Sequence, residues 1–148
     1  MTDTLGRVIY FNYDGNNNLT SIAQNWNGWW RTMVSFGWGS NLPMDVSSLS
    51  GALVVGTYQG DSIPVLRQVG FLDGSYYTFD YSAVGQVNMI RRKTYDNIER
   101  SHLAYDYDSS NNDCPRITQT RVAAGNWTGV NGMPAEVATQ FDAATDKS

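Results

Sequence analysis

The sequence predicts an all-β fold, and three observations lead to that prediction. Aromatic residues make up 13% of the 148 residues and charged residues only 16%, a balance typical of β-rich proteins. Short runs rich in Val, Ile, Thr, Tyr and Phe recur along the chain, separated by Gly, Asn, Asp and Ser, as expected for strands and turns. One segment, Tyr10–Ile22, has a counterpart at Thr78–Ile90 that aligns with it without a gap. The length is that of a single domain, residues 1–148.

Taken in order, the runs predict about ten strands. The first alternates, with Ile9, Phe11 and Tyr13 on one side and Val8, Tyr10 and Asn12 on the other. The last segment with regular patterning, 135–144, has some helical character, but the alternation of Val137, Thr139 and Phe141 favours a strand. The expected strands are 7–13, 19–24, 31–38, 52–58, 65–71, 76–81, 87–94, 103–107, 116–123 and 136–141.

The internal repeat predicts β-hairpins. In each copy an aromatic strand ends in Tyr, a short polar turn follows, and a second strand begins with an aliphatic residue. Tyr13 aligns with Tyr81, and Tyr107 falls on the same position in a third, looser copy. The late turn position is Asn17 in the first copy and Gly85 in the second, the two residue types that best tolerate a positive φ.

These segments resemble the RHS/YD repeat, whose units carry Leu-Gly-Arg, then Tyr-Asp, a turn and Leu. The resemblance rests on the stretches 2–22, 72–87 and 100–108 and places units near 2–24, 72–94 and 100–123. It implies consecutive antiparallel hairpins that form a curved sheet of YD-type units. It also implies that Tyr13, Tyr81 and Tyr107 are recurring packing residues.

The sequence departs from the family pattern in several places. Tyr13 and Tyr81 are much further apart than Tyr81 and Tyr107, so we expect 25–66 to be an irregular insertion or a degenerate unit. Ser82 stands where the family has Asp, and no Asp-Pro-x-Gly signature of the family's self-cleavage site occurs. The chain begins within a unit, which favours a piece of a longer shell.

The resemblance implies a non-enzymatic structural module of a secreted or cell-surface protein, part of a β-shell or a self-associating β-assembly. Its partners would be further repeat units, or other copies of the chain, paired through the sheet edges. A net charge of −4 disfavours nucleic acid as a partner. The sequence shows neither a signal peptide nor an apolar run near the roughly 20 residues of a membrane span.

A carbohydrate-binding β-module is the alternative. Trp29, Trp30 and Trp127 stand beside Asn and Gly residues, and exposed Trp flanked by amides suits stacking against a sugar ring. Burial against the sheet or at the end of a hairpin would explain the same residues.

An enzyme is a third hypothesis, and the sequence offers it little. His102 is the only histidine, and no Gly-x-Ser-x-Gly motif accompanies it. Glu99 and Glu136 could pair with Asp residues for glycoside hydrolysis, but no pair is marked out. With Cys114 as the only cysteine, neither an intrachain disulfide nor a conventional zinc site is expected.

We therefore expect no cofactor, with calcium as an open alternative. The spacings Asp14-x-Asn16-x-Asn18-x-Thr20 and Asp106-x-Asp108-x-Ser110-x-Asn112 resemble the start of a calcium loop. Both lack the Gly at the sixth position and the closing Glu. Polar hairpin turns would carry the same residues.

Overall fold

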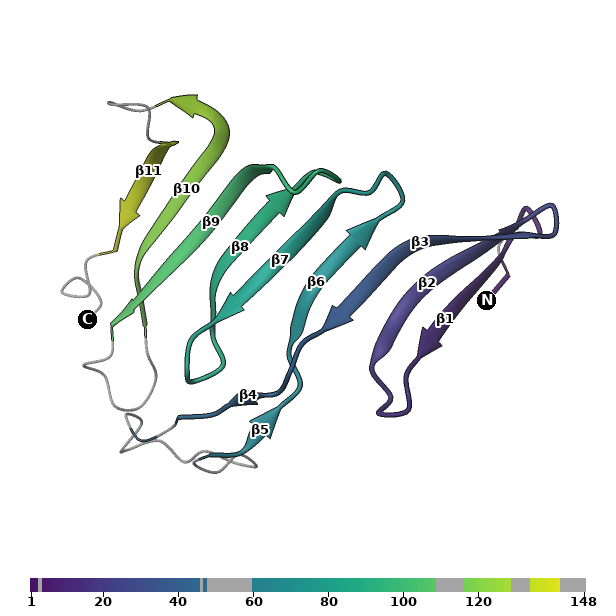
Figure 1. Cartoon of the computed structure of the whole chain (residues 1–148), viewed down its shortest axis with the longest axis horizontal. Helices are drawn as coiled ribbons and strands as arrows, with labels where there is room; N and C mark the ends of the chain where they lie inside the picture. Colours follow the sequence, from purple (N-terminus) through teal and green to yellow (C-terminus); the bar gives the residue numbers. More distant parts are fainter. Residues whose placement is uncertain (3, 46, 48–59, 109–115, 129–133, 142–148) are drawn as a thin grey trace.

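The protein is an open antiparallel sheet built from hairpins that follow one another along the chain. A computed structural model describes residues 1–2, 4–45, 47, 60–108, 116–128 and 134–141. Nine strands form the main sheet in the order β1-β2-β3-β6-β7-β8-β9-β10-β11, and β4 pairs with β5 in a separate two-stranded sheet (Figure 1). The strands are β1 Val8–Tyr13, β2 Leu19–Trp26, β3 Trp29–Trp38, β4 Leu42–Pro43, β5 Ser62–Ile63, β6 Leu66–Phe71, β7 Tyr76–Tyr81, β8 Val87–Lys93, β9 Glu99–Asp108, β10 Arg116–Thr128 and β11 Pro134–Gln140.

The predicted fold class is confirmed: the described residues contain strands and no helix, and the sheet is not closed. In the segment 135–144, where helix and strand competed, residues 135–140 belong to the strand β11, and residues 142–144 lie outside the described part. The expected strand 52–58 lies outside the described residues. None of the described elements is a helix long and apolar enough to cross a membrane.

Part of the tract 25–66, expected to be an irregular insertion or a degenerate unit, forms regular strands. Its residues 29–38 form β3, a full member of the main sheet between β2 and β6. Asn27 and Gly28, both with positive φ, connect β2 to β3, as suits a two-residue hairpin turn. The small β4–β5 sheet then interrupts the main meander and is joined to the β7–β8 turn, where the Asp45 amide donates to the Ala83 carbonyl.

Two turns at one end of the sheet share a hydrogen-bond pattern. The Asp14 amide donates to Asn18 O, and the Ser82 amide donates to Gln86 O. Asn17 and Gly85 hold the same place in these turns, with φ of 63° and 82°. The sequence-based expectation of a positive φ at both positions is therefore confirmed.

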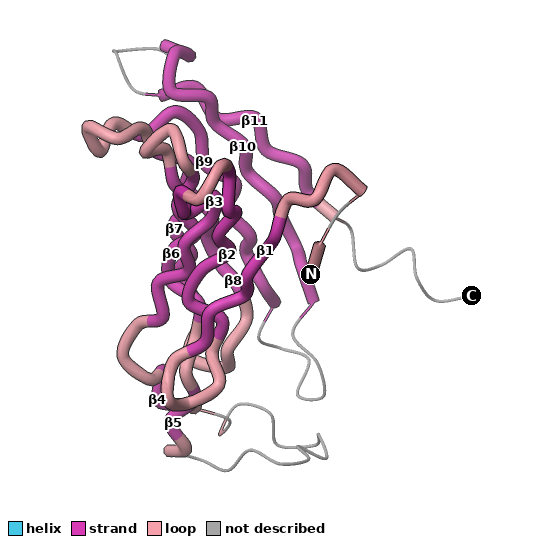
Figure 2. Tube along the Cα trace, turned by 90° about the vertical axis from the view of Figure 1, so that its right-hand side faces the viewer, coloured by secondary structure: helices cyan, strands magenta, loops and turns pink. Residues whose placement is uncertain are grey.

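The main sheet is a single curved layer. Figure 2 shows β1 at one end, and β10 and β11 at the other, displaced to the same side of the central strands β6 and β7. Only five described hydrophobic residues are buried. They are Ala23, Met44, Val65, Ala104 and Ala123. Because no second layer covers either face of the described sheet, most of its large side chains are only partly buried.

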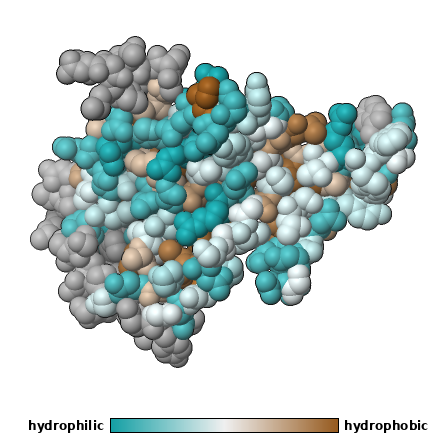
Figure 3. Space-filling view, viewed as in Figure 1, coloured by the Kyte–Doolittle hydropathy of each residue, from teal (hydrophilic) through white to brown (hydrophobic). Residues whose placement is uncertain are grey.

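The strand register divides the side chains into two faces, since directly opposed residues lie on the same face. One face is apolar: Phe11 opposes Ile22, Phe36 opposes Val69, and further along the sheet Phe79 and Leu103 both oppose Ile90. The other carries most of the charge over β7–β11, and Figure 3 shows hydrophilic side chains gathered over this half of the molecule. We call the face that carries Phe11, Phe36 and Phe79 the apolar face, and the opposite face of the sheet the polar face.

Candidate functional site

A β-bulge recurs at one end of the sheet and marks the same position in four strand pairs. The register shifts between Asn12 and Tyr13, Gly37 and Trp38, Asp80 and Tyr81, and Ile117 and Gln119. In each pair an aromatic residue at or near the end of one strand opposes an aliphatic residue at or near the start of the other. The opposed residues are Tyr13 and Leu19, Trp38 and Leu66, Tyr81 and Val87, and Tyr107 and Ile117.

Three of these aromatic side chains hydrogen-bond back to the preceding strand of the sheet. The Tyr81 hydroxyl donates to Leu66 O at 2.6 Å, and the Tyr107 hydroxyl donates to Val87 O at 2.6 Å. The Trp38 indole Nε1 donates to Leu19 O at 2.8 Å in the same manner. Each bond therefore joins the end of a strand to the start of the strand before it. We call Trp38, Tyr81 and Tyr107 the latch residues.

The side chains of the two latch tyrosines, Tyr81 and Tyr107, are partly buried, and this burial affects the pKa of their hydroxyls. Burial raises the pKa of the Tyr81 hydroxyl, and the nearby Arg67 guanidinium, 5.3 Å from the ring centroid, opposes that rise. Burial likewise raises the pKa of the Tyr107 hydroxyl. Both hydroxyls are therefore protonated at neutral pH and available as donors.

Tyr13 holds the same position as the latch residues but at the edge of the sheet. It ends β1, which has no strand before it in the described sheet, and its side chain is 60% exposed. The sequence therefore placed all three tyrosines at equivalent positions, of which two are latched. It missed Trp38, because the latch role becomes visible only when the register pairs Trp38 with Leu66.

Each edge of the sheet has a different character. At β1, the Ile9 amide donates to Met1 O and the Met1 amino group donates to Ile9 O, so the first residues of the chain cover the start of this edge strand. At β11, the Phe141 amide donates inward to Thr118 O. The opposite side of β11 is unpaired in the described sheet.

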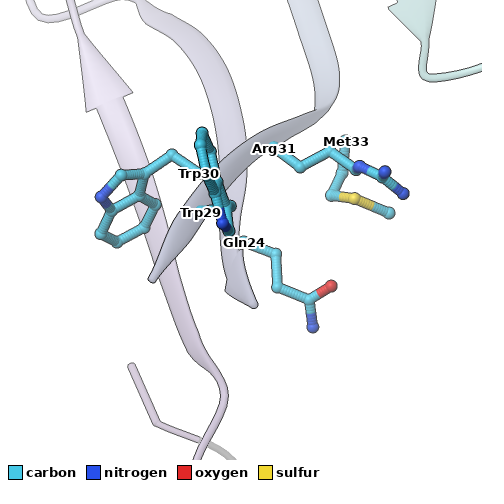
Figure 4. Close-up of a pocket in the computed structure, with 5 residues that line it drawn as sticks. All are labelled: Gln24, Trp29, Trp30, Arg31 and Met33. Carbon is cyan, nitrogen blue, oxygen red and sulfur yellow. The ribbon is translucent and has the colours of Figure 1, made fainter. Parts of the chain in front are cut away.

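A hollow lies on the hairpin formed by β2 and β3 (Figure 4). It has a volume of about 660 Å³ and is lined by Gln24, Trp29, Trp30, Arg31 and Met33. Trp29 is 80% exposed and Trp30 is 54% exposed, the latter meeting Tyr10 edge-to-face with ring centroids 4.5 Å apart. Trp127 lies in β10, but its side chain is outside the description, so the structure brings together only two of the three predicted tryptophans.

The first calcium-like spacing forms a turn. One carboxylate oxygen of Asp14 accepts from the amides of Asn16 and Asn18, and the other accepts from the Asn18 side chain. The hydrogen bonds from Asn18 lower the pKa of Asp14. In the second spacing Asp106 pairs with Arg121, while residues 110 and 112 lie outside the described part. No group of three or more metal-binding side chains occurs among the described residues.

The polar face carries a chain of ion pairs that crosses five strands. Arg91 pairs with Asp80 and lies 3.5 Å from Glu99, while Arg121 pairs with Asp106 at 3.1 Å. His102 stands between these groups. Its Nδ1 is 2.7 Å from a Glu99 oxygen, and its Nε2 is 2.8 Å from a Glu136 oxygen.

Comparison with known proteins supports the fold. The crystal structure of TcdB2-TccC3-TEV contains a similar chain, with a TM-score of 0.55, 15% sequence identity and 83% of the present chain covered. The likeness shows that the two chains share a fold over this stretch. The present chain spans only 5% of that chain's length. No protein-family model and no curated protein matches the sequence.

Proposed function

We propose that this chain is a non-enzymatic scaffold module of a secreted or cell-surface RHS/YD-repeat protein. In this role it supplies a stretch of antiparallel sheet to a β-shell or to a self-associating β-assembly. The observation that carries the proposal is the recurring bulge, combined with three latches of the same kind. The latches join β3, β7 and β9 to the strands before them, and the arrangement can be extended by adding hairpins.

The exposed apolar surface supports a role in assembly. Phe11 on β1 is 46% exposed and Val137 on β11 is 56% exposed, both on the apolar face at the two edges. Edge strands with apolar side chains and unpaired backbone groups favour pairing with another chain. Further strands of the same kind are therefore the partners that the sheet fits best.

Sedimentation velocity over a concentration series tests the proposal. We expect the unaltered chain to self-associate and the double variant Phe11→Lys/Val137→Lys to remain monomeric, because a charge at each edge opposes strand pairing. Tyr95→Lys is the matched control: Tyr95 is 82% exposed but lies in the β8–β9 turn, away from both edges. An unaltered chain that stays a stable monomer at high concentration would contradict self-association.

The proposal assigns no reaction to the chain. Both ring nitrogens of His102, the only histidine, face carboxylate oxygens, so neither is positioned as a base for a hydroxyl nucleophile. We expect no turnover in a broad hydrolase screen. Turnover that disappears in the variant His102→Gln would overturn this part of the proposal.

Carbohydrate binding is the second candidate, favoured by the high exposure of Trp29 beside Trp30, Gln24 and Arg31 in one hollow. The indoles offer stacking surfaces, and the amide and guanidinium offer donors for sugar hydroxyls. A glycan array followed by tryptophan-fluorescence titration tests it. Binding should be lost in Trp29→Ala and kept in Tyr95→Ala; the absence of any sugar response would exclude this candidate.

A further inference from the structure

The side chains of Glu99, His102 and Glu136 form a bridge over β10, which we call the histidine clamp. His102 lies on β9 and Glu136 on the edge strand β11, 34 positions further along the chain. Both are opposite Ala123 of β10 on the polar face, and Ala123 is only 2% exposed. The contact between His102 and Glu136 thus joins β11 directly to β9.

The two short contacts require a proton. A carboxylate can only accept hydrogen bonds, and neutral imidazole has only one N–H to donate. Because Glu99 and Glu136 approach opposite ring nitrogens at 2.7 and 2.8 Å, both nitrogens donate only when His102 is the imidazolium. The neutral ring would keep one carboxylate and face the other with a lone pair.

The charges around the clamp favour the protonated ring. Glu99 also faces Arg91 of β8, which pairs with Asp80 of β7, and Glu136 also faces Arg121 of β10, which pairs with Asp106 of β9. These four carboxylates outnumber the two guanidiniums, so a proton on His102 reduces the excess negative charge. Burial lowers the pKa of His102, but the bonds to Glu99 and Glu136 outweigh it, and the pKa is raised above 6.5.

We propose that the histidine clamp is a pH-sensitive device that holds the edge strand β11 in the sheet when His102 is protonated and loosens it when His102 is neutral. The contact between His102 and Glu99 lies within β9, whereas the contact between His102 and Glu136 joins β9 to β11. Loss of the second contact therefore acts on β11, the strand that forms one open edge of the sheet. Protonation of His102 at low pH therefore stabilises this edge, and the loss of that proton as pH rises loosens it.

The stability of the closed clamp depends on pH through the proton that His102 binds. Because the pKa of His102 is higher in the closed clamp than in the open one, the stabilisation is complete below the ordinary histidine pKa of about 6.5 and is lost as pH rises through the raised value. The chain has one histidine, so no other histidine titrates in this window. The N-terminal amino group lies away from the clamp, because it bonds Ile9 O at the opposite edge of the sheet.

NMR on the full chain tests the clamp with two readouts. Titration of the imidazole gives the pKa of His102, and hydrogen exchange of the Val137 and Thr139 amides on β11, taken relative to Phe79 on β7, reports the opening of the edge. We expect the relative protection of β11 to fall as His102 loses its proton. The total fold-change should not exceed the antilogarithm of the difference between the measured pKa and that of a free histidine, because the open clamp keeps the contact with Glu99.

Three variants complete the test. In Glu136→Gln the amide can donate to a neutral ring, so relative protection of β11 should become independent of pH. His102→Gln should also remove the dependence, whereas Asp80→Asn, which removes a neighbouring charge but no clamp contact, should keep it. A His102 pKa at or below 6.5, a flat profile in the unaltered chain, or a persistent dependence in Glu136→Gln would each overturn the proposal.

Discussion

The hairpin β1–β2 and the hairpin β7–β8 share one backbone frame but differ in what holds their side chains. Both have a bulge before the terminal Tyr and a turn with the same two backbone hydrogen bonds. In β7–β8, Asp80 pairs with Arg91, and Tyr81 bonds Leu66 O. In β1–β2 the equivalents of Asp80 and Arg91 are Asn12 and Ala23, and Tyr13 is exposed.

The difference shows which features belong to the frame and which depend on position in the sheet. The bulge and the turn are local, so they form in both hairpins. The latch needs a strand on the other side, so Tyr13 at the edge of the described sheet lacks the contact made by Tyr81. The small side chain of Ala23 leaves room for a ring pair. Tyr10 of β1 and Trp30 of β3 meet edge-to-face from the strands on either side of Ala23.

Removing the aromatic side chains should produce the largest difference in stability between the two hairpins. Tyr81→Ala and Tyr107→Ala should each lower the free energy of unfolding by about 2–3 kcal/mol, because each removes partly buried apolar surface and the latch hydrogen bond. Tyr13→Ala, at an exposed position, should cost less than about 1 kcal/mol. Urea denaturation followed by circular dichroism measures all three.

The Phe variants separate the hydrogen bond from the ring. Tyr81→Phe and Tyr107→Phe keep the ring and should each cost about 1 kcal/mol, while Tyr13→Phe should be close to neutral. Equal losses at all three positions would show that the latch bond contributes nothing to stability. Loss of folding in the Ala variants would leave the Phe series as the deciding measurement.

Exchanging the turn residues tests the part of the frame that the hairpins share. Gly85→Asn should destabilise by about 1 kcal/mol, because a side chain there has to tolerate a positive φ and to displace the Met44 methyl group, which would lie 3.1 Å from the new Cβ. Asn17→Gly meets neither obstacle and should change stability by less than about 0.5 kcal/mol. Thermal unfolding of the two variants side by side provides the check, and an equal loss in both would contradict the positive φ and the Met44 contact as the source of the cost at Gly85.

Local signals explain how much of this structure could be predicted from the sequence. Alternation and turn residues located β1 and β7, and a positive φ could be assigned to Asn17 and Gly85, because these features depend on neighbours in the chain. The Asn27-Gly28 turn carries the dipeptide signal of a tight hairpin, although the expected strands 19–24 and 31–38 stop two residues short of it on each side.

Contacts between distant strands could not be predicted in this way. The Trp38 latch depends on a register set across the interruption by β4 and β5, and the approach of Glu136 to His102 depends on β10 lying between their strands. Neither residue type nor spacing reveals such pairs. The equivalent strand positions of the repeated tyrosines were therefore predictable, and the contacts on the polar face were not.

Replacing the charged residues should have the smallest effect on stability. These variants test whether the Asp80–Arg91 ion pair, which β1–β2 lacks, stabilises the hairpin β7–β8. Asp80→Asn and Asp106→Asn each weaken a partly exposed pair with an arginine, so each should cost about 0.5–1 kcal/mol at low salt and less at high salt. Asn12→Asp introduces the same carboxylate where Ala23 offers no guanidinium, and it should bring no gain at either salt concentration. Urea denaturation at two ionic strengths distinguishes these outcomes. A salt-independent cost at Asp80 would mean that the polar face is stabilised by hydrogen-bond geometry rather than by charge, and that β1–β2 lacks a shape-dependent contact rather than an ion pair.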